Sequence, residues 1–334
     1  MKTKLLLTIL FAFIYCTVNA QVQKQSPSNT IKKFTTGIKR PLPEVKFKGL
    51  YNPPSVDLKW KPILKNQVPE NDIVYDEKLE ALKRENAKIK KEWEEQRKSL
   101  KDEKSLQAVT PVIGINYLGN PYNGCPPDNS IAISNGGIIV ATANSTIEYD
   151  DMSGNNLYWN YLEGTSGFFG DTLTSICDAS VIYDSGADRF IMVTQTCHGN
   201  STSSEVIICF SQTNNPQNGW WVYRFNGDVL NDNHWFDFPR IAVSTNEVYV
   251  SGNLFTNTPY AFYQTCLFQM TKSVGYSGGS YNATNSGVWT GINDGDGNPS
   301  FTLVPVQYGQ QGNYGPGVYL VSNIYLGGSS LYLY

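Results

Sequence analysis

Positive charge is scarce over the last two thirds of this 334-residue sequence. Residues 106–334 contain only four Lys and Arg against 16 Asp and Glu, a net charge of −12. Residues 21–105 have the opposite balance, with 20 basic and 13 acidic residues and a net charge of +7. The contrast indicates two regions of different character. Because an acidic domain repels phosphates, we exclude nucleic acid as a partner of the larger region.

Histidine is nearly absent, since His198 and His234 are the only two. Neither has the spacing of a zinc ligand, and neither has a serine or cysteine nucleophile near it in the sequence. Zinc chemistry and a Ser-His-Asp relay are therefore disfavoured. His234 and Trp235, close to Asp237, are predicted to line a binding mouth, with packing inside the sheets as the favoured alternative for Trp235.

Long apolar runs are absent after the first 20 residues, so no later segment predicts a membrane-spanning helix. The chain begins with basic residues, continues with an apolar run over residues 5–16 and then reaches small Ala20. This order predicts a secretory signal peptide, residues 1–20. A lipid anchor on Cys16 is the alternative, which bulky Tyr15 disfavours. We expect a secreted or cell-surface protein.

Five cysteines remain after the signal peptide: Cys125, Cys177, Cys197, Cys209 and Cys266. An exported chain meets oxidising conditions, which permit disulfides, but an odd count leaves at least one thiol without a partner in the chain. Cys177 and Cys197 flank a predicted hairpin near Gly186 and are the first choice for a cross-strand disulfide. Buried free thiols are the alternative.

Two segments precede the acidic region. Residues 21–71 are rich in Lys, Pro, Asn and Ser, and their spaced prolines predict an extended or disordered arm. Residues 72–105 contain no Pro or Gly and consist mainly of strong helix formers, which predicts one long charged helix.

The helix has a stripe of residues spaced alternately by three and four: Tyr75, Leu79, Leu82, Asn86, Ile89, Trp93, Gln96 and Leu100. This spacing allows a short coiled coil and self-association through the helix. The favoured alternative is a charged helix that lays the stripe against the acidic domain.

Residues 112–334 predict an all-β domain, because short alternating apolar runs are separated by clusters of Gly, Asn and Ser. Three segments share the order aspartate, apolar strand, tight turn, apolar strand; they begin at Asp128, Asp178 and Asp237. The starting residues are 50 and 59 positions apart, about the length of a four-stranded unit. A fourth unit is predicted at residues 317–322 and 330–334.

Repeated units of this kind favour a β-propeller over a sandwich, because small sheets arranged in a ring cover one another's apolar faces. The sequence stops inside a strand of the fourth unit. Either residues 111–119 supply the closing strand of a four-bladed ring, or the ring is incomplete; the second reading is favoured.

Five stretches carry a family resemblance: residues 125–128, 181–190, 211–220, 235–240 and 248–253. Over about residues 112–334 the chain resembles a group of secreted bacterial propeller proteins of mostly unassigned function. Many members carry a C-terminal sorting domain for type IX secretion. The resemblance implies the fold and export, and it assigns no activity.

Two sets of residues are candidates for binding. Asp128, Asp178 and Asp237 start equivalent strands, so in a ring they would gather at one end of the channel and bind a cation or sugar hydroxyls. The favoured alternative is that each caps a local turn.

The second set lies in one loop: Asp294, Asp296 and Asn298 alternate on a glycine-rich segment, a pattern that suits calcium. No glutamate follows at the position that completes an EF-hand, so a polar turn is favoured there.

These observations favour an exported, non-catalytic binding module for a glycan, a protein or a cell surface. The alternative is a carbohydrate-active hydrolase that uses acidic residues at the channel mouth. The distance between paired carboxylates, on which such a reaction depends, is not given by the sequence.

Overall fold

The computed structural model describes residues 38–41, 50–51, 73–99, 114–122, 126–170, 172–197, 199–258, 261–306, 315, 317–323 and 331–334. All of them belong to the compact unit Phe34–Tyr334. The predicted signal peptide, most of the arm, Cys125 and His198 lie outside the described residues.

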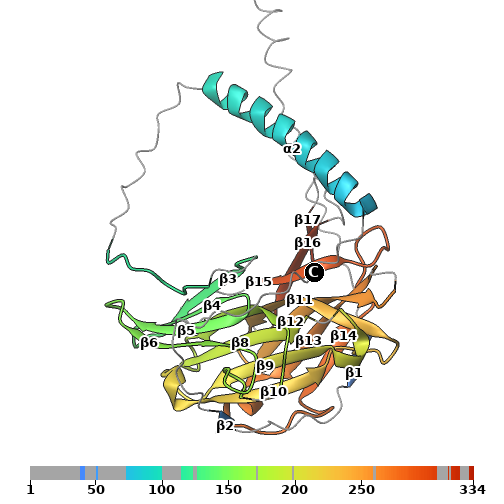
Figure 1. Cartoon of the computed structure of the whole chain (residues 1–334). Helices are drawn as coiled ribbons and strands as arrows, with labels where there is room; N and C mark the ends of the chain where they lie inside the picture. The colour runs from blue at the N-terminus through green and yellow to red at the C-terminus, as the bar shows by residue number, and fades with distance from the viewer. Residues whose placement is uncertain are drawn as a thin grey trace, which may run out of the picture. The chain divides into compact units, whose positions relative to one another are not determined.

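The predicted all-β class is confirmed, because the described residues beyond 126 form four antiparallel sheets, none of them closed (Figure 1). The first sheet contains β3 (Asn129–Ile133), β4 (Ile138–Ala143), β5 (Thr146–Asp151) and β6 (Asn156–Tyr161). The second contains β7 (Ile176–Asp184), β8 (Arg189–Thr196), β9 (Glu205–Ser211) and β10 (Trp220–Asn226). The third contains β11 (His234–Val243), β12 (Glu247–Thr256), β13 (Phe262–Thr271) and β14 (Ser286–Thr290). The fourth contains β15 (Phe301–Val306), β16 (Tyr319–Asn323) and β17 (Leu331–Leu333).

Short helical turns join some of these strands: η1 (Ser201–Ser203), η2 (Pro216–Asn218) and α3 (Lys272–Tyr276). The tight turns have local causes. Between β7 and β8, the Asp184 carboxylate accepts hydrogen bonds from the backbone N–H groups of Gly186 and Ala187, at 3.1 and 3.3 Å. Such side-chain capping is why aspartate favours turns.

The predicted strand pairs of the first three units are present as β3–β4, β7–β8 and β11–β12. The fourth unit differs in one respect. Its predicted strands correspond to β16 and β17, the second and third strands of the sheet, and the first strand, β15, was not predicted. Pro305 lies in β15 and obscures the strand pattern, because proline is unfavourable inside sheets.

Consecutive sheets pack face to face. The first strands follow one another in contact, β3 with β7, β7 with β11, and β11 with β15. Three buried clusters fill the spaces between sheets: the first and second share one around Trp220, the second and third share one around Phe236, and the third and fourth share a smaller one around Leu303. Burial between sheets therefore stabilises the domain more than any single sheet does.

Two pieces of the predicted arm belong to the β-domain. β1 (Ile38–Pro41) pairs with the outer edge of the third sheet at β14, and β2 (Leu50–Tyr51) pairs with the outer edge of the second sheet at β10. The boundary predicted at residue 112 therefore misses two edge strands. Residues 114–122, the described part of the proposed closing segment and its continuation, form no strand.

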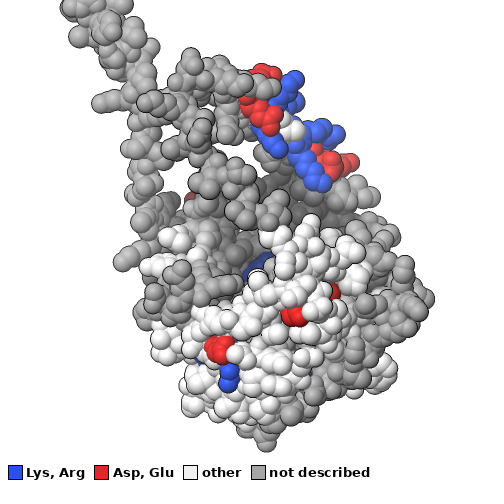
Figure 2. Space-filling model, turned by 90° about the vertical axis from the view of Figure 1, so that its left-hand side faces the viewer, with Lys and Arg blue, Asp and Glu red and all other residues white. Residues whose placement is uncertain are grey.

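The predicted helix is present as α2 (Ile73–Ser99). Charged side chains gather on it in Figure 2. Ile89 and Trp93 of the predicted stripe are 48% and 66% exposed. Self-association through the helix and docking of the stripe against the β-domain both remain predictions. No helix in the described part of the chain combines the length and hydrophobicity that a bilayer span requires.

Attachment of β1 depends on Gly287, which is opposite Pro41 in the β1–β14 ladder. A Cβ atom at this position would lie 2.9 Å from the Arg40 carbonyl oxygen and 2.7 Å from Lys39 Cε. We therefore expect Gly287→Val to displace β1 from the sheet edge. Amide exchange at residues 38–40 should become at least about tenfold faster, whereas exchange in β11 should be unchanged. Unchanged exchange at β1 would show that the close approach is not needed.

Candidate functional site

The three predicted aspartates lie together where the first strands begin. The Asp128 carboxylate lies near that of Asp178 and helps to raise its pKa. Gln195 of β8 joins the third member, because its Nε2 donates to Asp178 Oδ2 at 2.9 Å and to Asp237 Oδ1 at 2.5 Å. The first three sheets thus contribute one carboxylate each to a single group, which we call the aspartate cluster.

Irregular backbone at the start of the first strands positions these side chains. Asp128 and Asp178 have φ angles of 35° and 56°, and Phe238, next to Asp237, has a φ of 62°. The strand register shifts at Cys177/Ser180 and at Asp237/Arg240, which are β-bulges. Aspartate tolerates the left-handed region better than most residues, so it suits these positions.

The electrostatics of the cluster are unusual. Burial, followed by the nearby Asp237 and Asp128 carboxylates, raises the pKa of Asp178 to about 7. Burial also raises the pKa of Asp237, against the lowering effect of hydrogen bonds from Gln195 and from the Phe238 N–H. The hydrogen bond from the Phe238 N–H is the turn-capping role that was the favoured alternative for these aspartates. Asp237 therefore caps a local turn and also belongs to the cluster. Burial therefore disfavours full ionisation of the cluster.

A cavity of about 280 Å³ lies between the first strands of all four sheets. Its wall includes Ser130 of β3, Ser180 of β7, Arg240 of β11 and Val304 of β15. The Arg240 guanidinium also lies 3.6 Å above the Phe238 ring, which is 36% exposed. The three aspartates are not in the cavity wall, but Arg240 lines the cavity and interacts electrostatically with all three, so it connects the cavity to the aspartate cluster.

His234 and Trp235 are not in the cavity wall. The His234 ring stacks on Tyr263 at 4.0 Å, and its Nδ1 lies 2.5 Å from Asp232 Oδ1. Trp235 is buried, and its Nε1 donates to the Thr256 carbonyl oxygen at 3.2 Å. This arrangement agrees with the packing role that was favoured for Trp235.

The predicted calcium loop is closed by its own hydrogen bonds. Asp294 Oδ1 accepts from the backbone N–H groups of Asp296 and Asn298 at 2.9 and 3.0 Å. Asp296 Oδ2 accepts from the Tyr332 hydroxyl at 3.3 Å. These bonds favour the polar-turn interpretation, and calcium binding by the loop remains a prediction.

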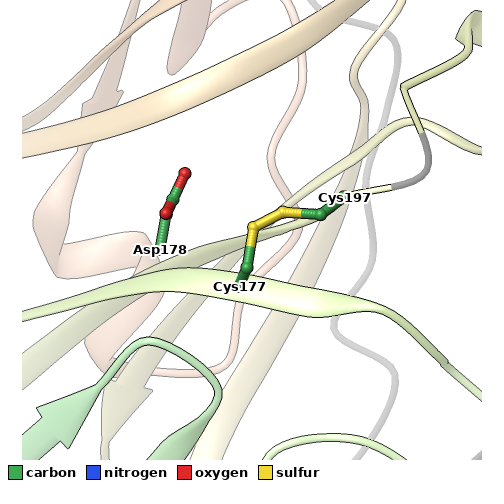
Figure 3. A group of neighbouring side chains, drawn as sticks. All are labelled: Cys177, Asp178 and Cys197. Atoms are coloured by element: carbon green, nitrogen blue, oxygen red, sulfur yellow. A yellow bond between two sulfur atoms is a disulfide. The ribbon is translucent and has the colours of Figure 1, made fainter. Parts of the chain in front are cut away.

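The predicted disulfide between Cys177 and Cys197 is confirmed, with a Cα–Cα distance of 6.0 Å. Together with Asp178, these cysteines form the one set of three Cys, His, Asp or Glu ligand atoms within 4.8 Å of one another in the described residues (Figure 3). Because the two sulfur atoms are bonded to each other, they supply no thiolate for a metal. The disulfide instead connects the strands that carry Asp178 and Gln195. Cys209 and Cys266 are buried free thiols.

A second acidic pair was not predicted. Glu148 and Asp150 alternate on β5 and are 4% and 3% exposed, and Asn156 Nδ2 donates to both carboxyl groups. Glu148 Oε2 is buried and accepts no hydrogen bond. Burial, followed by the charge of Asp150, raises the pKa of Glu148 to about 8. The alternation of polar and apolar residues in β5 could have indicated the shared face, but not its burial.

The chain matches no protein-family model, no curated protein and no solved structure.

The Glu148–Asp150 pair predicts a loss of stability at high pH. The folded-state pKa of Glu148, about 8, is above its ordinary value of 4.5, so its contribution is fully present below pH 4.5 and is lost as the pH rises through 8. Glu148→Gln keeps an acceptor for Asn156 and cannot ionise. We expect Glu148→Gln to raise the Tm at pH 9 by about 4–8 °C and to have little effect at pH 4. Equal shifts at both pH values would contradict this explanation.

Proposed function

We propose that this protein is an exported, non-catalytic binding module whose cavity takes the end of a glycan at a cell surface. In this proposal the four sheets are blades of a propeller-type ring, and β3, β7, β11 and β15 are its innermost strands. The contacts between successive first strands, and the position of one cavity among all four, support the ring.

The chemistry of the site supports a ligand rich in hydroxyl groups. Carboxylates accept hydrogen bonds from hydroxyls, and a guanidinium donates to them. Arg240 in the cavity wall offers the donor, the aspartate cluster with which it interacts offers the acceptors, and Phe238 beside the guanidinium adds an exposed aromatic face. A volume of about 280 Å³ is near the lower limit for ligand sites, so it suits a terminal sugar rather than a long chain.

Export is supported by two observations of different kinds. The first is the disulfide, which is stable in an oxidising compartment. The second is the signal-peptide pattern of the first 20 residues, together with the resemblance to secreted proteins of the type IX secretion class.

One observation favours a second function, a carbohydrate hydrolase. A carboxyl group with a pKa of about 7, as at Asp178, is suited to general acid catalysis. However, the Gln195 amide is hydrogen-bonded to both Asp178 and Asp237, at 2.9 and 2.5 Å, so it fills the space between these two carboxylates where a glycosidic bond would have to lie. The binding function is therefore preferred.

The binding function predicts the effect of changes at Phe238 and Arg240. We expect Phe238→Ala and Arg240→Gln to weaken binding of the best ligand in a glycan panel by at least about tenfold, because each removes one recognition group. Calorimetric titration measures the affinity. Met152→Ala is a matched control, because Met152 is 56% exposed and not in the cavity wall.

The same panel, supplied as chromogenic glycosides, separates the two functions. Turnover that disappears in Asp178→Asn would establish the hydrolase instead. Binding that is unaffected by both Phe238→Ala and Arg240→Gln would remove the cavity from the proposal.

A further inference from the structure

The charges of the aspartate cluster do not balance. Asp128, Asp178 and Asp237 carry three negative charges when ionised, and the Arg240 guanidinium interacts with all three. No ion pair of 4 Å or less joins Arg240 to these aspartates in the described part of the chain. Full ionisation thus leaves two negative charges in a partly buried group, the amount that one divalent cation neutralises.

A separate observation concerns Gln195, whose side chain is fully buried. Its amide nitrogen donates to Asp178 and Asp237, but its amide oxygen has no hydrogen-bond donor. A buried carbonyl oxygen without a partner costs about 1–3 kcal/mol. In the Gln195 amide, therefore, the nitrogen has hydrogen-bond partners in the protein and the oxygen has none.

A rotation of the Gln195 amide by half a turn would exchange the positions of its oxygen and nitrogen atoms. The two ends of a glutamine amide have nearly the same shape, so this rotation places the oxygen where the nitrogen now lies, facing both carboxylates. Three oxygen ligands from two sheets would then face one point, whereas the present orientation faces them with a donor. A cation at that point would make the rotated orientation favourable.

We propose that Asp178, Asp237 and the Gln195 amide oxygen bind one Ca²⁺ ion beside the starts of β7 and β11. Carboxylate and amide oxygens are hard ligands, which suit Ca²⁺ rather than zinc or copper. Asp128 adds a further negative charge near Asp178. Ca²⁺ takes six to eight oxygens, so positions remain for water or for ligand hydroxyl groups.

The site is distinct from the loop that contains Asp294 and Asp296. In that loop, Asp294 Oδ1 already accepts two backbone N–H groups. In the aspartate cluster, in contrast, the carboxylates of Asp178 and Asp237 face each other across the Gln195 amide.

The test is a calorimetric titration of the chelator-treated full chain with Ca²⁺ alone, without any glycan. We expect one ion to bind with a Kd of about 10⁻⁵–10⁻³ M. Asp237→Asn and Gln195→Leu should weaken binding at least tenfold, whereas Gln195→Glu, which keeps an oxygen at the same place, should bind at least as tightly as the unchanged chain. Circular dichroism establishes that each variant is folded.

Asp294→Asn is the matched control and should leave the affinity unchanged. Failure of the unchanged chain to bind Ca²⁺ at 10 mM, or about 10 times the weakest expected Kd, would overturn the proposal. Binding that is lost in Asp294→Asn and retained in Asp237→Asn would also overturn it and assign the ion to the loop. Because glycan is absent from this titration, its outcome is separate from that of the glycan experiment.

Discussion

The contact between the first strands of consecutive sheets is the constraint on which the rest of the structure depends. A sheet of three to five strands cannot cover both of its faces, so each sheet here is stabilised by its neighbours. Hydrogen bonds between first strands also fix how neighbouring sheets are aligned. Ser130 Oγ of β3 accepts from the Val181 N–H and donates to the Val181 carbonyl oxygen of β7, which fixes the alignment of the two strands.

The candidate site is a product of the same packing. The three aspartates lie near the starts of neighbouring first strands. Register shifts and residues with positive φ angles at these strand starts direct the aspartates toward one another. The Cys177–Cys197 disulfide lies immediately beside this group, with the Cys197 sulfur 3.4 Å from Gln195 Nε2. A covalent link at that position limits the relative movement of the strands that carry Asp178 and Gln195.

The sequence predicted the features that depend on local pattern. The all-β class, the strand pairs that begin near Asp128, Asp178 and Asp237, the long helix and the Cys177–Cys197 disulfide all follow from periodicity, turn residues or spacing. The strand pairing of the arm could not be predicted, because residues 38–41 and 50–51 become strands only when a distant sheet edge is available.

The site was predictable only in outline, for a related reason. Recurrence at equivalent strand starts was enough to group the three aspartates, although their proposed role in binding is untested. Gln195 and Arg240 were not predicted as members, since nothing in the surrounding residues separates them from ordinary strand positions. Burial of Glu148 and Asp150 also depends on three-dimensional packing, and the local sequence indicates only that both share a face.

The pairing of β1 with β14 has a consequence for synthesis of the chain. Arg40 donates to the Thr290 hydroxyl 250 positions later in the sequence, so β1 has no pairing strand until nearly the whole domain has been synthesised. Exposed strand edges recruit other chains. A nascent polypeptide of this design is therefore most vulnerable to aggregation late in translation, and a holding chaperone would help most at that stage.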